Sequence, residues 1–284
     1  MIFNPSKITL SLLLCFSINS LAAATPVNGS QHFKKVVWVV LENTNFQGAL
    51  KQPDLAKLTK SGALLTNMFG ETHPSQGNYI AMIAGSPLGV KGDKSIDLPD
   101  THIGDLLERA GKDWRVYAED FPGNCFIGPT SGSYARKHVP FISFKNVSGD
   151  PSRCKKIEAA ERFSQDLSAG LTPAYSMYIP NLKNDGHNTS VDFAGKWLSS
   201  NFGSVLNNPA ALGDTLFIIT FDESEGTSPN QIYTVLLGSK IKPGSTSAQQ
   251  LDHTSLLKMI EDEFQLGNLG RADAKAPVIS GIWK

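Results

Sequence analysis

The strongest constraint on the fold comes from short apolar runs that are mostly continuous rather than alternating. They are rich in β-branched and aromatic residues. A strand that is buried on both faces has this pattern because neither face meets water, and such strands are typical of a mainly parallel sheet. Strands are therefore predicted at residues 36–41, 64–69, 114–117, 175–179, 216–221 and 232–237.

Segments with helical spacing of apolar residues lie between these runs. Helices are predicted at residues 53–61, 76–84, 101–110, 157–167, 191–202 and 254–264. The alternation predicts an α/β fold, with a mainly parallel central sheet and helices on both faces. No linker interrupts the pattern, so residues 25–284 are expected to form a single domain. The Gly/Pro-rich stretch 121–153 is interpreted as an insertion over the sheet edge.

The first 24 residues have the pattern of a targeting segment. Lys7 precedes an apolar stretch at residues 8–18, and residues 22–24 are alanines, so cleavage is predicted after residue 24. The apolar stretch is too short to span a bilayer. We therefore expect a signal peptide and an exported protein, periplasmic or secreted, with no integral membrane contact.

The charge balance limits the classes of partner. Lys and Arg total 26, as do Asp and Glu, so the formal net charge is zero. A neutral chain does not attract a phosphate backbone at long range, which argues against a nucleic-acid partner. The oligomeric state is left open by the sequence.

Cys125 and Cys154 remain after removal of the targeting segment. In an oxidising compartment the default expectation is a disulfide, and free thiols are the alternative. The bond would close a loop of about 30 residues, which stabilises a fold by roughly 3–4 kcal/mol in the chain-entropy treatment.

Polar clusters follow several of the predicted strands. They are Glu42 and Asn43, residues 71–78, residues 180–187, and Asp222 and Glu223. In an α/β sheet, ligands bind beyond the carboxyl ends of the strands, so these clusters are expected to meet at one edge. Each cluster alone could serve a turn or a cap. Gathered together, the carboxylates would repel one another unless a cation lies among them, and their oxygens suit a hard or borderline divalent ion.

Ser75 is the candidate nucleophile because it opens the helix predicted at residues 76–84. Free backbone N–H groups at a helix start can hold a phosphate or a developing anion. The alternative is that Ser75 is only an N-cap. Asn78 could donate to an oxyanion, and His187 or His253 could bind phosphoryl oxygens or protonate a leaving alkoxide.

These motifs resemble those of a secreted phosphoesterase family that includes bacterial acid phosphatases and phospholipases C, in the alkaline-phosphatase-like superfamily. The resemblance covers nearly the whole chain after residue 24, in family order. The matching segments are VWVVLENTNF (37–46), THPSQGNYIAMIAG (72–85), YARKHVPF (134–141), IPNLKNDGHNTS (179–190), ITFDE (219–223) and HTSLLKMIEDEF (253–264).

The resemblance implies a divalent metal, whose identity stays open among Ca, Mg, Mn and Zn, and a phosphorylated serine. The residues implied are Glu42, Asn43, Asp222 and Glu223 for the metal, Ser75 as nucleophile, His187 and His253 as catalytic histidines, and Asn78, His73, Asp185 and His138 for the phosphate. His138 belongs to a basic segment, residues 136–138, that is expected either near the site or as a solvated charge run.

The expected activity is hydrolysis of phosphate monoesters, as in acid phosphatases, on a small phosphate ester or a phospholipid head group. The chain ends at residue 284 without the extra C-terminal domains of larger phospholipases C, which favours this interpretation. Alternatives are a phospholipase C or another phosphodiesterase and, in a different class, a non-enzymatic phosphate-ester binding module. A sulfatase is disfavoured because residues 72–76 lack a Cys or Ser two residues before Pro-x-Arg.

Overall fold

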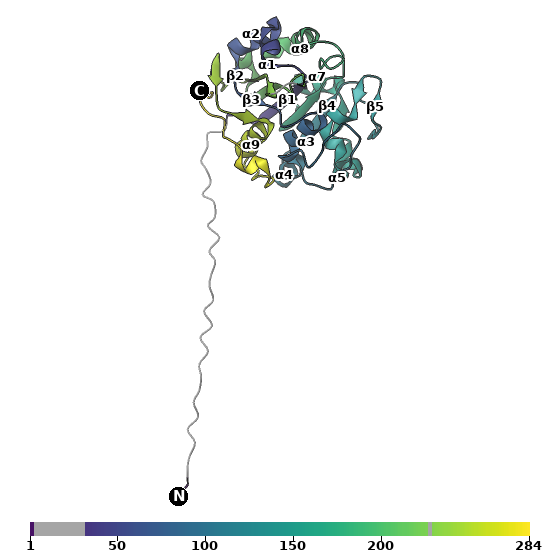
Figure 1. Cartoon of the computed structure of the whole chain (residues 1–284), viewed down its shortest axis with the longest axis vertical. Coiled ribbons are helices and arrows are strands. Elements are labelled where there is room, and N and C mark those ends of the chain that lie inside the picture. Colours follow the sequence, from purple (N-terminus) through teal and green to yellow (C-terminus); the bar gives the residue numbers. More distant parts are fainter. Residues whose placement is uncertain (3–31, 227–228) are drawn as a thin grey trace. The chain divides into compact units, whose positions relative to one another are not determined.

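An eight-stranded sheet forms the centre of the computed structural model, which describes residues 1–2, 32–226 and 229–284 (Figure 1). All neighbouring strands in it run parallel except β11, which is antiparallel to both of its neighbours. Across the sheet the order is β12 (Ser245–Ser247), β2 (Ala63–Leu65), β11 (Thr234–Leu237), β9 (Thr215–Phe221), β1 (Lys35–Leu41), β8 (Tyr175–Ile179), β4 (Trp114–Ala118) and β7 (Ile157–Ala159).

The central strand β1 shows why continuous apolar runs predicted this sheet. It pairs in parallel with β9 on one side and β8 on the other, with Val39 opposite Ile219 and Tyr178. Every residue from Val36 to Leu41 is buried, so both faces of the strand lie in the core. Because its apolar side chains alternate between two covered faces, the strand fixes the helical layers on both sides.

Helices cover both faces of the sheet. Figure 1 shows α1, α2 and α8 on one side and α3, α4 and α9 on the other. The bounds are α1 (Phe46–Lys51), α2 (Pro53–Ser61), α3 (Gln76–Ala84), α4 (Ile103–Arg109), α7 (Glu161–Ser168), α8 (Val191–Leu206) and α9 (His253–Phe264). The predicted fold class, α/β with a mainly parallel sheet, is confirmed. Residues Gln31–Lys284 form one unit by their contacts.

Some predicted elements differ from those observed. The run at residues 64–69 is divided between β2 and β3 (Met68–Phe69), because the backbone N–H of Thr66 bonds to Ser247 and β3 then joins a second sheet. That sheet has the order β10 (Gln231–Ile232), β3 and β13 (Leu251–Asp252), so the run at 232–237 is divided as well. The helix predicted at 157–167 begins as strand β7, and its helical part is α7.

The β7 error has a physical cause. Ile157, Ala160, Phe163 and Leu167 have helical spacing, which is why the whole segment was predicted as a helix. Ile157 nevertheless pairs with Val116 at the edge of the sheet. A strand this short carries no period of its own, so the pairing with β4 decides its conformation.

The insertion at residues 121–153 contains only short elements, and a disulfide closes it. The elements are β5 (Thr130–Ser131), β6 (Tyr134–Ala135), η1 (Arg136–His138), η2 (Pro140–Ser143), α5 (Lys145–Ser148) and α6 (Pro151–Cys154). The predicted bond between Cys125 and Cys154 is confirmed, with 29 residues of sequence separation.

Removal of this disulfide should destabilise the protein measurably. We expect the double variant Cys125→Ala, Cys154→Ala to lose about 3 kcal/mol of unfolding free energy, since the open loop gains freedom in the unfolded chain. Urea unfolding of the variant, compared with wild type before and after reduction, measures the effect. Equal stability of the oxidised wild type and the variant would contradict the prediction.

Two sequence predictions concern the N-terminus and the membrane. Residues 3–24 of the predicted signal peptide lie outside the described residues. In the part of the chain that the structure describes, no helix is both long and apolar enough to cross a membrane.

Candidate active site

The polar clusters predicted at strand ends are joined to one another by backbone hydrogen bonds. The N–H of Glu42, after β1, donates to the carbonyl of Asp185, after β8, at 2.9 Å. The N–H of Asp222, after β9, donates to the carbonyl of Leu41 at 3.0 Å. The carboxyl ends of three adjacent parallel strands therefore carry these acids at one edge of the sheet, as the sequence predicted.

Ser75 lies among these acids at the start of α3. Its Oγ is 3.0 Å from Glu42 Oε2 and 3.2 Å from Glu223 Oε1, and the residue is buried. The side chain makes no capping hydrogen bond to α3, so the N-cap alternative does not describe its contacts. The hydroxyl is held between two carboxylates instead.

Two buried oxygens around Ser75, Asn43 Oδ1 and Asp222 Oδ2, have no hydrogen-bond partner among the described residues. Two more, Glu42 Oε1 and Asp185 Oδ2, make no hydrogen bond of good geometry but lie 3.2 and 3.4 Å from the ring nitrogens of His138. Buried polar atoms in folded proteins are almost always satisfied, so an unpartnered set of oxygens indicates a missing ligand. Asn43 itself has a positive φ of 34°, a backbone region that Asn tolerates better than most residues.

Burial and mutual repulsion disfavour the charged forms of these carboxylates. Burial, followed by the charges of Asp222 and Asp185, raises the pKa of Glu42 well above its ordinary value. Burial and the Glu223 charge raise the pKa of Asp222 to about 7, and burial raises the pKa of Asp185 to about 7. A cation among the acids would remove this repulsion and lower these pKa values.

Asn78 and His73 both contact Glu223. Asn78 accepts from the N–H groups of Glu71 and Thr72 at 2.8 and 3.0 Å, and its amide nitrogen lies 3.4 Å from Glu223 Oε2. His73 Nδ1 lies 2.6 Å from the same carboxylate oxygen, and its side chain is 38% exposed. Asn78 thus orders the loop before Ser75, and His73 lies at the accessible side of Glu223.

His138 comes into the site from the insertion. It is buried, with Nε2 3.2 Å from Glu42 Oε1 and Nδ1 3.4 Å from Asp185 Oδ2, and its ring stacks on Tyr79. Burial and the Lys137 charge lower its pKa well below the ordinary value. For this residue the alternative of a solvated charge run is wrong.

The two histidines predicted as catalytic occupy different environments. His187 is exposed; its N–H donates to Asp185 Oδ1 at 2.8 Å, and its ring lies 5.9 Å from that of His138. His253 is fully buried, with Nδ1 2.6 Å from Glu71 Oε2 and Nε2 3.0 Å from the carbonyl of Phe221. Both ring nitrogens of His253 are therefore used within the protein.

The structure adds roles that the sequence did not assign. Glu71, from the predicted polar cluster 71–78, holds His253. Asp93, which the sequence did not indicate, accepts the N–H of Gln76 at 3.1 Å and pairs with Lys137 Nζ at 2.7 Å. Asp93 lies in a loop with no periodic pattern. The only feature of the sequence that pointed to the ion pair between Asp93 and Lys137 was the positive charge of residues 136–138. Glu71 and Asp93 both lie beside the helix start that carries Ser75.

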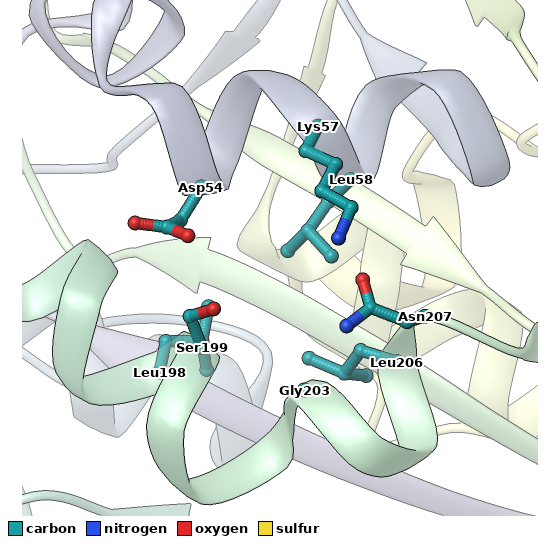
Figure 2. A pocket seen from close by; sticks show the side chains of 8 residues that line it. All are labelled: Asp54, Lys57, Leu58, Leu198, Ser199, Gly203, Leu206 and Asn207. Carbon is teal, nitrogen blue, oxygen red and sulfur yellow. The ribbon is translucent and has the colours of Figure 1, made fainter.

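A small cavity elsewhere contains none of the predicted site residues (Figure 2). It lies between α2 and α8, with Asp54 and Lys57 facing Ser199 and Asn207. Its volume of about 10 Å³ has room for about one water molecule. The candidate active site is the cluster around Ser75, on the strength of its contacts with Glu42 and Glu223.

Several solved structures share this α/β fold. A structure described as a protein in the alkaline phosphatase superfamily from Vibrio parahaemolyticus matches 87% of this chain and 71% of its own, with a TM-score of 0.57 and 14% identity. A phosphonate monoester hydrolase of Agrobacterium radiobacter matches 82% of this chain and 74% of its own, with a TM-score of 0.54 and 10% identity. At these identities the likeness shows the fold.

The chain belongs to the phosphoesterase family, whose model matches residues 45–267. It is 35% identical to a probable acid phosphatase of Kluyveromyces lactis, over 87% of this chain and 62% of the relative. It is 34% identical to a phosphatidylinositol-3-phosphatase of Mycobacterium tuberculosis, over 88% of this chain and 83% of the relative. The chain spans about three fifths of the length of the fungal relatives it matches.

Proposed function

We propose that this protein hydrolyses phosphate monoesters with a divalent metal ion, through a phosphoserine at Ser75. The observation that carries the proposal is the position of Ser75 Oγ, 3.0 Å from Glu42 and 3.2 Å from Glu223, with no capping bond. Relatives that are named acid phosphatases support the reaction class.

The oxygens of the candidate residues are of the type that a divalent ion prefers. Within the part of the chain that the structure describes, no three or more His, Cys, Asp or Glu side chains are gathered closely enough to hold a metal, so the three candidate carboxylates do not yet surround one point. An amide and a hydroxyl complete the candidate set, and Asn43 Oδ1 and Asp222 Oδ2 are buried without hydrogen-bond partners among the described residues. The residues that would hold the ion are Glu42, Asn43, Asp222 and Glu223, with Ser75. When bound, the ion would lower the pKa of the Ser75 hydroxyl and stabilise negative charge on the phosphoryl oxygens.

The protein's own residues account for the proton movements. Ser75 Oγ attacks phosphorus, so an Oγ–P bond forms while the ester P–O bond breaks; the hydroxyl proton passes to a carboxylate oxygen of Glu42 or Glu223. The leaving oxygen takes a proton from His187, which is exposed at the edge of the site. A water molecule then attacks phosphorus and gives a proton to the His187 ring, the Oγ–P bond breaks as phosphate leaves, and Ser75 Oγ takes back its proton from the carboxylate.

His253 has a positioning role in this proposal. Burial opposes a charge on its ring, but Glu71 and the Phe221 carbonyl outweigh burial and raise its pKa. Because both ring nitrogens of His253 face oxygen acceptors, its hydrogen bonds to Glu71 and to the Phe221 carbonyl fix the end of β9 directly before Asp222. His187, rather than His253, is therefore assigned to the leaving group.

A phosphorylated lipid head group is a second candidate substrate. It is favoured by the likeness to the mycobacterial phosphatidylinositol-3-phosphatase, of which this chain covers 83%. The chemistry at Ser75 would be the same, because that substrate is also a phosphate monoester.

A substrate panel tests the proposal. The panel contains p-nitrophenyl phosphate, phosphatidylinositol 3-phosphate in vesicles, bis(p-nitrophenyl) phosphate and phosphatidylcholine, each with and without chelator. We expect hydrolysis of the monoesters, loss of activity after chelation and recovery on adding a divalent metal. A preference for the diesters would support a phosphodiesterase or phospholipase C, and no hydrolysis by the metal-loaded protein would support a binding module.

Export is part of the same proposal. The bond between Cys125 and Cys154 fits an oxidising compartment, since cytosolic proteins rarely keep disulfides. Fractionation of cells that express the full chain would place it in the periplasm or medium, and recovery in the cytosol would contradict export.

A further inference from the structure

The ammonium group of Lys137 lies beside the acidic site and is linked through Asp93 to the helix that Ser75 precedes. Lys137 Nζ is 2.7 Å from Asp93 Oδ2, and Asp93 Oδ1 accepts the N–H of Gln76, the residue after Ser75, at 3.1 Å. The two side chains are 18% and 31% exposed, so a solute can reach the pair. Asp93 thereby ties Lys137 to the start of α3.

Arg136 and His138, the chain neighbours of Lys137, are already engaged in other contacts. Arg136 is buried, and its guanidinium bonds to Asp97 and to the carbonyls of Ile96 and Ile142. The two ring nitrogens of His138 face Glu42 and Asp185. Arg136 therefore holds the insertion against the loop before α4, and His138 is enclosed by the site.

Lys137 keeps donors that its described contacts do not use. An ammonium group has three N–H donors, and within the described residues its hydrogen-bond partner is Asp93. Its charge also acts on the site: burial raises the pKa of Glu42, and Lys137 partly opposes that rise. The remaining donors are accessible to a bound anion.

We propose that Lys137 binds a phosphoryl oxygen of the substrate and of the phosphate product, with Asp93 as its positioning residue. The assignment rests on the proposed function and adds a contact to it. An ammonium group in this place would offset the negative charge that four nearby carboxyl groups direct at an anionic substrate. It would also complement the N–H groups at the start of α3.

Phosphate binding and turnover of matched variants test the proposal. Titration calorimetry with inorganic phosphate is performed on the metal-loaded protein, and KM and kcat are measured with p-nitrophenyl phosphate. We expect Lys137→Met to weaken phosphate binding and raise KM by about 10- to 100-fold, the range for a lost charge-assisted hydrogen bond. Lys137→Arg should stay within about threefold of wild type.

Two further variants separate binding from support of the fold. Lys145→Met removes an exposed lysine of the same insertion, and we expect phosphate affinity equal to that of wild type. Asp93→Asn can still accept the N–H of Gln76 with its amide oxygen, but it removes the carboxylate partner of Lys137, so phosphate affinity should fall by less than in Lys137→Met. Metal content and thermal midpoint are measured for every variant.

Some outcomes would overturn the assignment. Wild-type phosphate affinity in folded, metal-loaded Lys137→Met would overturn it. A loss of affinity in Asp93→Asn equal to that in Lys137→Met would also overturn it, because the lysine would then be only a structural partner of Asp93. If wild type binds phosphate through Lys137 but hydrolyses no ester, the proposed function fails and the assignment stands. Absence of phosphate binding by wild type overturns the assignment of Lys137, whereas hydrolysis in the substrate panel decides the proposed function.

Discussion

Ser75→Ala is expected to lower kcat on p-nitrophenyl phosphate by about 10³-fold or more, because no other hydroxyl is held between Glu42 and Glu223 among the described residues. The variant lacks the oxygen that would form the bond to phosphorus. Acid quenching with radiolabelled substrate should give labelled protein for wild type and none for the variant.

The fold should survive this substitution, because Ser75 makes no capping bond that its removal could break. Ser61→Ala, at the end of α2, is the matched control, because its hydroxyl bonds to the Leu58 carbonyl of its own helix and to no other described residue. We expect the control to keep wild-type turnover and both variants to bind metal. Turnover near that of wild type in Ser75→Ala would exclude a phosphoserine at this position.

Asp222→Asn is expected to stabilise the metal-free protein, whereas most substitutions of buried residues lower the unfolding free energy. In chelated wild type, Asp222 is a fully buried acid whose pKa is raised to about 7 by burial and Glu223. A raised pKa means that the folded state binds more protons than the unfolded state. The stability that protonated Asp222 contributes is fully present below pH about 4 and is lost as the pH rises through about 7.

At pH 8 the chelated variant should therefore be more stable than chelated wild type, by about 1–3 kcal/mol. Its unfolding free energy should also vary less between pH 5 and pH 8. Added divalent metal should stabilise wild type strongly and the variant little, and the variant's activity should fall by about 100-fold or more. Urea unfolding at both pH values, with and without chelator, measures these effects.

Asp214→Asn is the control for this prediction, because Asp214 precedes the same strand at its other end. Its carboxylate is 56% exposed and pairs with Lys34, an exposed contact of small energetic value. We expect this variant to respond to pH and metal like wild type. If Asp222→Asn and wild type changed in stability equally with pH and with metal, Asp222 would neither hold the metal nor destabilise the metal-free protein.

The parts of the fold that the sequence predicted well are those fixed by local pattern. The apolar run before Glu42 is buried on both faces, and a parallel strand places its last residues at the edge where ligands bind. The position of Ser75 at a helix start followed from the helical spacing after it. The division of the run at residues 64–69 depended on pairing with β13 and β12, which lie about 180 residues later in the chain.

The contacts that the sequence could not predict join distant loops. Asp93 bonds to Gln76 and Lys137, and Glu71 bonds to His253, so each contact depends on the finished packing of the domain. From residue type alone, the sequence left the proton donor for the leaving group open between His187 and His253. Its contacts with Glu71 and Phe221 became visible only in three dimensions.

The backbone bonds between the ends of β1, β8 and β9 have a consequence for the life of the chain. Glu42, Asp185 and Asp222 come from segments far apart in sequence, and they meet only when these strands are registered side by side. Under the proposed function, a nascent polypeptide therefore has the acids but no hydrolytic centre. The site can act on a phosphate ester only after these three strands have paired.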